Sequence, residues 1–288
     1  LVLVTTNKID VASLKGKVSL EPKAEIDWDN AESHVPESWS SLKSPYVVLP
    51  GRYRPGTQYT VKVAPGAVDE FKQAAPAFQK PVRLEDLEPS FSTGAPIAVI
   101  EAERDGTLPV ESVNLTTANV QVWTLSPEEL APLLAWEPYG QRTPEPIPQR
   151  PAASVTLDLK AQKNRAQYTP LKLRELLPEG QKTGLFLVHA RAPELDGNHS
   201  HRVLAELTDL AVHAKLGAKS GVLWVTRLSK GTPVEGARVR LLDRAGETKW
   251  EGTTDASGLA TTPGLVGLVP GTDDSWRTPF ALAVAEAD

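Results

Sequence analysis

The sequence predicts an all-β fold of three consecutive β-sandwich domains, with a short helix in the middle domain. Runs in which apolar and polar residues alternate recur along the 288 residues, and turn-forming residues bound each run. The 25 prolines and 20 glycines fall between these runs and have no collagen-like period. Because one sandwich takes roughly 100 residues, this length suits three domains.

The clearest pattern lies near the C-terminus. After a Gly- and Pro-rich turn at residues 231–236, apolar side chains alternate with arginines. Ala237, Val239 and Leu241 therefore share one face of a predicted strand, because successive strand residues point to opposite faces. A second turn is predicted at residues 255–258, where Asp and Gly provide the turn chemistry.

The first domain is predicted to cover residues 1–94. Tyr59, Val61 and Val63 alternate with polar residues in its clearest strand. Residues 69–90 are polar and broken by prolines, which predicts a long excursion. Further strands are predicted near residues 2–4, 18–20, 46–49 and 91–94, with a short helical turn or a loop at 10–14. We expect the strand at 91–94 to close this domain.

The middle domain is predicted to cover residues 95–208. Its helix is predicted to begin at Ser126, because Glu129 lies three residues later, as in a capping box, and Pro127 takes the first helical position. The buried stripe of this helix should comprise Leu130, Leu133 and Leu134. Strands are predicted at 97–99, 113–115, 120–124, 155–159, 168–173, 184–188 and 202–207.

Two loops of this middle domain carry strong turn signals. Five prolines between residues 136 and 151 indicate an extended surface loop, which we expect to be nicked first by proteases at residues 137–150. Asp196 and Gly197 predict a hairpin turn between two strands.

The last domain is predicted to cover residues 209–288. About seven strands in about 80 residues are typical of an immunoglobulin-like sandwich. Six of these strands are predicted near residues 212–214, 221–228, 237–242, 249–250 and 280–284 and from Leu259.

Composition excludes several classes of function. The net charge is −5, from 31 basic and 36 acidic residues without a basic run, so we expect no nucleic-acid partner. No apolar run reaches the ~18 residues of a membrane-spanning helix. The chain has no cysteine, which fits a bacterial envelope protein better than a small disulfide-stapled domain. It also lacks methionine, so we expect Leu1 not to be the natural start and any signal peptide to lie upstream.

Several strings resemble the N-terminal part of bacterial alpha-2-macroglobulin-like proteins. The last domain carries, in the order of a macroglobulin-like domain of that family, the strings at 208–212, 224–226, 231–239 and 254–259. The middle domain resembles the macroglobulin-like domain before it. The first domain resembles an Ig-like domain that often precedes both, through Pro-Gly-Thr-x-Tyr-Thr-Val-x-Val at 55–63 and Phe-Ser-Thr-Gly at 91–94.

This resemblance implies a non-catalytic fragment of a protease-trapping inhibitor in the periplasm or cell envelope. The family traps proteases after a bait region is cut, and many members capture the attacker through a Cys–Gln thioester. Both features would lie outside this cysteine-free chain. The implied partners are proteases, bound by the full-length protein, and neighbouring domains of the same chain. We expect no catalytic residue, no cofactor and no metal site in this chain.

Three clusters of residues each have a functional and a structural interpretation. Asp196, His199 and His201 have too few ligands for zinc, and decoration of a hairpin is favoured over a metal site. Asp255 and Ser257 lack the surroundings of a hydrolase triad, and a turn is favoured. The acidic residues Asp27, Asp29 and Glu32 surround Trp28 without EF-hand spacing, and a solvated loop is favoured over a calcium site.

The seven tryptophans could form a carbohydrate platform, but packing in cores and interfaces is favoured. Trp224 lies within an apolar strand and is predicted to be buried, whereas Trp39, Trp136 and Trp276 lie in predicted loops. A modular adhesin or carbohydrate-binding surface protein stays the alternative to a protease trap, because similar sandwich strings occur in such modules and a fold does not fix a function.

Overall fold

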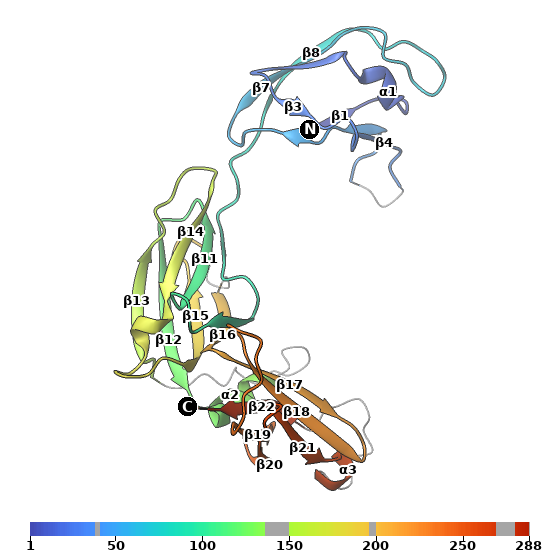
Figure 1. Cartoon of the computed structure of the whole chain (residues 1–288). Helices are drawn as coiled ribbons and strands as arrows, with labels where there is room; N and C mark the ends of the chain where they lie inside the picture. Colours follow the sequence, from blue (N-terminus) through green and yellow to red (C-terminus); the bar gives the residue numbers. More distant parts are fainter. Residues whose placement is uncertain (38–40, 136–149, 196–199, 269–279, 288) are drawn as a thin grey trace. The chain divides into compact units, whose positions relative to one another are not determined.

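The computed structural model describes residues 1–37, 41–135, 150–195, 200–268 and 280–287. Strands dominate it, which confirms the predicted all-β fold of consecutive sandwiches with a short helix in the middle one (Figure 1). The chain forms two compact units, Leu1–Glu88 and Pro89–Asp288. The second unit contains two sandwiches, called here the middle sandwich and the last sandwich.

The first unit is a small sandwich. One sheet has the order β1-β5-β4 and another the order β2-β7-β8, while β3 and β6 pair separately. Val47, Leu49 and Val61 are fully buried at its centre. Its elements are β1 (Val2–Val4), α1 (Val11–Leu14), β2 (Val18–Glu21), β3 (Glu25–Ile26), β4 (Glu32–His34), β5 (Tyr46–Val48), β6 (Gly51–Arg52), β7 (Gln58–Val63) and β8 (Phe78–Arg83).

Strand β8 lies in the segment that was expected to be an excursion, so that expectation is wrong for residues 78–83. The strand runs antiparallel to β7, with Arg83 opposite Gln58. Every residue of β8 except Val82 is exposed, so the strand has no apolar alternation to detect. Pro81 is compatible with this edge strand because its missing N–H is not needed by a further neighbour.

The middle sandwich packs a five-stranded sheet, β10-β16-β15-β12-β13, against a three-stranded sheet, β14-β11-β9. Fully buried side chains such as Val110, Val122 and Phe186 fill the space between them. Its elements are β9 (Ser90–Ser92), β10 (Ile97–Glu101), β11 (Thr107–Val113), β12 (Thr117–Leu125), α2 (Pro127–Ala135), β13 (Ala153–Asp158), β14 (Ala166–Lys172), a 3-10 turn (Leu173–Leu176), β15 (Gly184–Arg191) and β16 (Ser200–Thr208).

Strand β9 belongs to the middle sandwich, so the prediction that residues 91–94 close the first domain is wrong. Phe91 lies opposite Ser112 of β11 and is only 5% exposed within the middle core. The division between the two units accordingly falls between Glu88 and Pro89. A strand's own residues do not reveal which neighbour it will pair with, because that choice depends on contacts distant in sequence.

The last sandwich packs the sheet β17-β18-β21 against the sheet β20-β19-β22. Val239 and Leu241 share the core face of β19, and Ala237 is buried directly before the strand, which confirms the predicted alternation. Its elements are β17 (Leu210–Leu216), β18 (Ser220–Arg227), β19 (Arg238–Asp243), β20 (Thr248–Thr253), β21 (Leu259–Pro263), α3 (Leu265–Leu268) and β22 (Phe280–Glu286).

Candidate functional site

The middle and last sandwiches meet at a joint that has two attachments. The first is covalent and very short, because β16 ends at Thr208 and β17 begins at Leu210. The connecting residue, Asp209, is held by the last sandwich at two atoms. Its carbonyl oxygen accepts a hydrogen bond from Leu228 N at 2.7 Å, and its carboxylate accepts one from Ser229 N at 2.9 Å. The connection is therefore a fixed crossing between two strands.

The second attachment is the helix α2, whose start is fixed by the predicted capping box. Ser126 N donates to Glu129 Oε2 at 2.8 Å, and Glu129 N donates to Ser126 Oγ at 3.3 Å. These reciprocal hydrogen bonds satisfy two backbone donors that would otherwise lack partners at the helix start. The capping-box prediction is confirmed. It explains why such a short helix, with Pro132 inside it, forms at this point.

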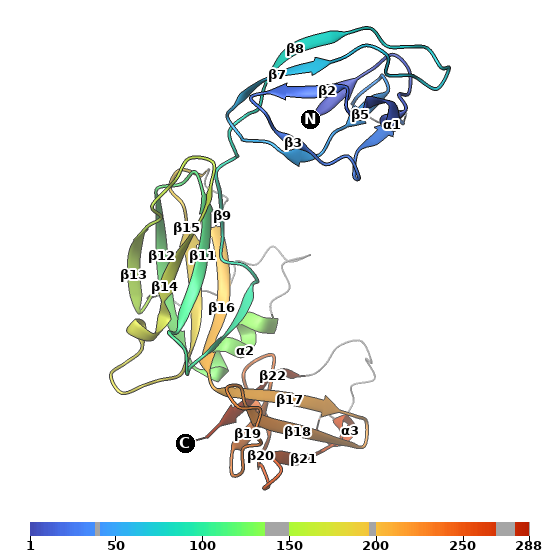
Figure 2. The ribbon, with the colours of Figure 1, turned by 45° about the horizontal axis from the view of Figure 1, so that its top comes forward.

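Helix α2 lies between the middle and last sandwiches (Figure 2), and its apolar side chains belong to one hydrophobic cluster. On one side lie Trp123, Leu187 and Leu204, which form one cross-strand row on the outer face of the five-stranded sheet. Leu282 of β22 joins the same cluster from the last sandwich. The buried helix residues of the cluster are Leu130 and Leu133, with Leu134 partly buried beside them. One hydrophobic cluster thus includes residues from both sandwiches.

A buried arginine adds a charged contact to this joint. Arg240 of β19 is only 9% exposed, although it occupies the face of the strand opposite the last sandwich's core. Its Nη1 lies 2.6 Å from Glu128 Oε1 on α2, and its Nη2 lies 3.2 Å from Glu286 Oε1 on β22. The hydrogen bond from Arg240 lowers the pKa of Glu128. Removing either carboxylate would leave a buried cation short of a partner, which is costly.

Glycine is required where the last sandwich touches the start of α2. Gly246 has a φ of +85°, and a Cβ at this position would overlap the carbonyl oxygen of Glu128. The turn that presents it is ordered by Asp243, whose Oδ1 accepts hydrogen bonds from Ala245 N and Glu247 N, both at 2.9 Å. Any larger residue at position 246 would strain the backbone and push the helix away.

The contacts between the middle and last sandwiches were largely not predictable from sequence patterns. The alternation of β19 placed Arg240 on a face that is normally solvated, and nothing near it indicates that Glu128, 112 residues earlier, approaches it. The leucine stripe of α2 was predicted, but its second partner was not. The only indication in the sequence was the wide apolar face of α2, which is typical of a helix that packs against more than one surface.

The predicted turn at Asp255 is confirmed. Its Oδ1 accepts hydrogen bonds from Ser257 N at 2.8 Å and Leu259 N at 3.0 Å, so the carboxylate orders the turn before β21. Of the histidine cluster, only His201 lies in the described chain, where its ring contacts Phe91 edge-to-face. Asp196 and His199 lie outside the described residues, as do the Asp196–Gly197 turn and the proline-rich loop at 137–149.

The acidic patch around Trp28 is partly used for local structure. Asp27 accepts a hydrogen bond from Asn30 Nδ2 at 2.8 Å, and this bond lowers the pKa of Asp27. Trp28 packs partly buried against the core of the first unit. Within the described ranges, no group of three or more His, Asp or Glu side chains is arranged to hold a metal ion.

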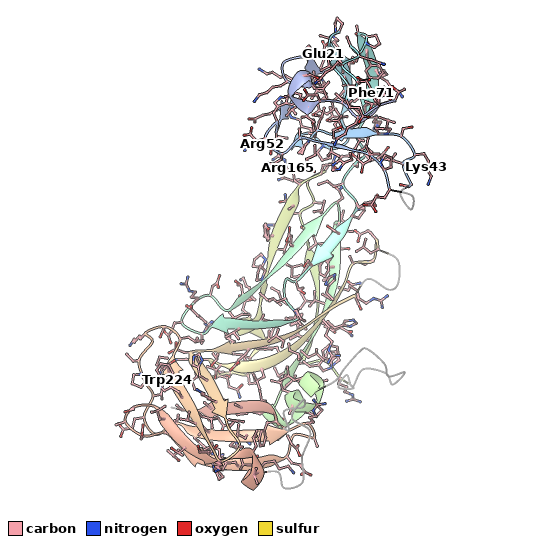
Figure 3. The ribbon with its side chains drawn as sticks, turned by 90° about the vertical axis from the view of Figure 1, so that its right-hand side faces the viewer. Glu21, Lys43, Arg52, Phe71, Arg165 and Trp224 are labelled. Carbon is pink, nitrogen blue, oxygen red and sulfur yellow. The ribbon has the colours of Figure 1, made fainter. Side chains whose placement is uncertain are left out.

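The prediction that Trp224 is buried is wrong. Its side chain lies at the surface of the last sandwich and is 42% exposed (Figure 3). Its neighbours Leu223 and Val225 occupy the core face, so Trp224 must point outward, where its ring lies tilted beside that of His213 and its Nε1 donates to Ser257 O at 3.2 Å. In a strand of nearly continuous apolar residues, the sequence does not distinguish the two faces. Trp39, Trp136 and Trp276 lie outside the described residues.

Comparisons with known proteins agree with the sequence resemblance. A family model described as the bacterial alpha-2-macroglobulin MG3 domain matches residues 207–277. A curated alpha-2-macroglobulin homolog from a Nostoc species is 24% identical over 263 residues, which cover 83% of this chain. The chain spans about 13% of the length of that relative.

Solved structures share the fold. Native alpha-2-macroglobulin from Escherichia coli, in a structure spanning domains MG0-NIE-MG1, aligns with a TM-score of 0.56 at 19% identity, covering 100% of this chain and 88% of that one. A mutant Salmonella alpha-2-macroglobulin aligns with a TM-score of 0.59 at 18% identity, covering 100% of this chain and 17% of that one. The similarity to bacterial alpha-2-macroglobulins that the sequence indicated is confirmed.

Proposed function

Starting from the similarity of this chain to bacterial alpha-2-macroglobulins along its whole length, we propose that it is a non-catalytic scaffold of a protease-trapping inhibitor in the bacterial cell envelope. Its role is to hold its domains in a fixed arrangement. The bait segment and any thioester belong to other parts of such a protein. Proteases are partners of the full-length protein, and the partners of this region are neighbouring domains.

The double attachment between the middle and last sandwiches is the observation that supports this scaffold role. If only a flexible linker joined the two sandwiches, they would rotate relative to each other. Such motion is the usual behaviour of domains within one chain. Here rotation would separate Arg240 from Glu128 and expose the leucines of α2 to water. Both changes are unfavourable, so the joint resists bending. A trap that rearranges after cleavage needs parts that do not deform.

Three domains are part of this proposal. We place their boundaries near residue 89 and at Asp209. The first boundary follows the pairing of β9 with β11, and the second follows the single residue between β16 and β17.

An envelope location is also proposed, on the absence of cysteine and on the family resemblance. None of the helices in the described part of the chain has the length and apolar character needed to cross a bilayer. Fractionation of cells that express the complete natural gene should place the protein outside the cytoplasm. Recovery in the cytoplasmic fraction would contradict the location and leave the scaffold role to be judged separately.

The absence of inhibitory and enzymatic activity can be tested directly. The chain should neither inhibit trypsin or elastase at an equimolar ratio nor hydrolyse peptide and ester substrates. A complete bacterial alpha-2-macroglobulin, assayed in parallel against a protein substrate, serves as the positive control. Clear inhibition or turnover by this chain would refute the proposal.

The rigidity of the joint can be measured by electron paramagnetic resonance, because the chain contains no cysteine and accepts spin labels only where cysteines are introduced. Labels at Ala166→Cys in the middle sandwich and Ala256→Cys in the last sandwich should give one narrow distance distribution. Adding Arg240→Ala should broaden it. The matched control Arg238→Ala removes a neighbouring arginine that pairs with Glu251 and Glu286 within the last sandwich, and it should broaden the distribution less than Arg240→Ala does.

A second pair of labels separates local from interdomain motion. Glu103→Cys and Ala166→Cys both lie in the middle sandwich, and their distance should not respond to Arg240→Ala. A broad distribution between the sandwiches in the otherwise unmodified chain, with a narrow one for this second pair, would show that the joint is a hinge.

A further inference from the structure

A polar pocket lies on the outer face of the five-stranded sheet, across strands β13, β12 and β15. Its volume is about 480 Å³. The strand registers arrange its side chains in two rows of three. Asn119 has Thr156 and Arg191 as its cross-strand partners, and Gln121 has Ser154 and His189. Ala192, Pro193 and Leu195 form an apolar wall beside the two rows.

The side chains of Asn119, Gln121, Ser154 and Arg191 in this pocket are available to bind a ligand. Thr156 Oγ1 donates to Asn119 Oδ1 at 3.2 Å, which orients the amide and leaves Asn119 Nδ2 as a donor. Within the described part of the chain, the exposed side chains of Gln121, Ser154 and Arg191 make no hydrogen bond or ion pair. The amide of Gln121 and the guanidinium of Arg191 therefore face a shallow pocket without partners in the described protein, and they can bind an external ligand.

The pocket favours a ligand with negative charge. None of its lining residues is acidic, although the chain as a whole has a net charge of −5. Two nearby carboxylates are held in other contacts. Glu194 accepts hydrogen bonds from the backbone N–H and hydroxyl of Thr116, and Asp158 accepts one from Lys160 N at 2.9 Å. Arg191 is therefore the charged group that faces a bound molecule.

The spacing of the rows fits a sugar ring. Neighbouring strands lie about 4.8 Å apart and alternate residues along a strand about 6.7 Å apart, so the six side chains cover roughly 10 by 7 Å. Amide, hydroxyl and imidazole groups can each exchange hydrogen bonds with sugar hydroxyls. A guanidinium group forms a paired, charge-assisted interaction with a carboxylate. A peptide carboxylate would use Arg191 but would leave most of the remaining polar groups unused.

We propose that this pocket binds an acidic saccharide, a sugar that carries a carboxylate, with Arg191 holding the carboxylate and Asn119 and Gln121 holding ring hydroxyls. None of the described lining residues is Phe, Tyr or Trp, whose large rings stack on sugars, so a single sugar unit binds weakly, with a Kd of about 1 mM, and depends strongly on Arg191. This activity is independent of the scaffold role, and each can fail without the other.

Nuclear magnetic resonance titration of the full chain with glucuronate tests the proposal. Saturable shift changes should appear in β12, β13 and β15 and weaken about tenfold or more in Arg191→Gln, because the charge-assisted contact is lost. Arg165→Gln removes another exposed arginine, outside the pocket, and should bind as the unmodified chain does. Gln121→Ala, which keeps the charge, should weaken binding less than Arg191→Gln.

Two further ligands separate a sugar site from a simple anion site. Glucose has the hydroxyls without the carboxylate and should bind much more weakly than glucuronate. Acetate has only the carboxylate and should also bind much more weakly than glucuronate. The proposal would be overturned if acetate bound as tightly as glucuronate, or if Arg165→Gln weakened binding as much as Arg191→Gln. It would also be overturned if glucuronate caused no saturable shift changes in β12, β13 and β15. A peptide ending in a free carboxylate that binds more tightly than glucuronate would overturn it as well.

Discussion

The first unit and the middle sandwich are both sandwiches, but they are stabilised differently. Among the described residues, the main core of the middle sandwich contains eighteen buried apolar residues and that of the first unit contains seven. Partly buried side chains such as Trp28 and Val82 complete the smaller core. Since apolar burial is the largest favourable term in folding, the first unit must depend more on other interactions.

Loop hydrogen bonds are one such interaction in the first unit. Asp69 is 5% exposed and accepts hydrogen bonds from Asn7 Nδ2 at 2.7 Å, Phe71 N at 2.9 Å and Gln73 N at 2.8 Å. Ser13 Oγ accepts from Val68 N at 2.9 Å. The comparison teaches that one sandwich fold can be stabilised mainly between its sheets or, with a smaller core, by ordered polar loops as well.

The largest expected effect comes from opening the larger core. Phe186 is fully buried, and Phe186→Ala should destabilise the second unit by about 3–5 kcal/mol through lost burial and a cavity. Hydrogen exchange measured segment by segment in denaturant would locate the loss. Protection in the first unit should not change. A loss below about 1 kcal/mol would show that this core is not the principal support of the middle sandwich.

A substitution in the core of the first unit should lower the free energy of unfolding by less than Phe186→Ala does. Val61 is fully buried in the first unit, and Val61→Ala removes the equivalent of about two methylene groups, or about 2 kcal/mol. The same hydrogen-exchange measurement should show the loss in residues 1–88 alone. An equal loss of protection in the middle sandwich would mean that the two units unfold together.

Asp69→Ala tests the contribution of the polar loops. It leaves the backbone N–H groups of Phe71 and Gln73 without their acceptor, so the first unit should lose stability. Asp105→Ala is a control in the second unit, since this exposed carboxylate also accepts a backbone hydrogen bond in a turn, from Thr107 N. If Asp69→Ala and Asp105→Ala cause equally small losses of stability, loop hydrogen bonds do not contribute more to the first unit than to the second.

Acid should have the smallest and most gradual effect. Burial alone would raise the pKa of Asp69, but hydrogen bonds from Asn7, Gln73 and Phe71 outweigh it and lower the pKa. A lowered carboxyl pKa adds stability above the unfolded-state value, and this stability is lost as the pH falls through the folded-state value. Below the ordinary aspartate range, the first unit should therefore lose protection in its 67–75 loop first.

Acid should also weaken the joint between the middle and last sandwiches. The pKa of Glu128 is lowered by Arg240, so its contribution is present above the ordinary glutamate value and falls away below it. The spin-label distance across the joint should broaden in this range while the strands of both sandwiches remain protected. Simultaneous loss of the strands would show that the joint and the cores are one cooperative unit.

Much of the strand and helix pattern was predictable because its causes are local. Val239 alternates with arginines in the period of two that predicts a strand, and Ser126 and Glu129 satisfy each other's backbone within one helical turn. Strand β8 and the outward face of Trp224 were not predictable, because an exposed edge strand and a uniformly apolar strand both lack the alternation that identifies a face.

Residues near one another in the chain thus specify where strands, turns and the helix α2 begin, since hydrogen bonds and side-chain alternation act over a few residues. Long-range packing specifies what those elements do. Arg240 is buried because Glu128 and Leu282 bring α2 onto the last sandwich, and six polar residues form one pocket because three strands align in register. Such contacts depend on segments up to 112 residues apart, whose approach no local pattern encodes.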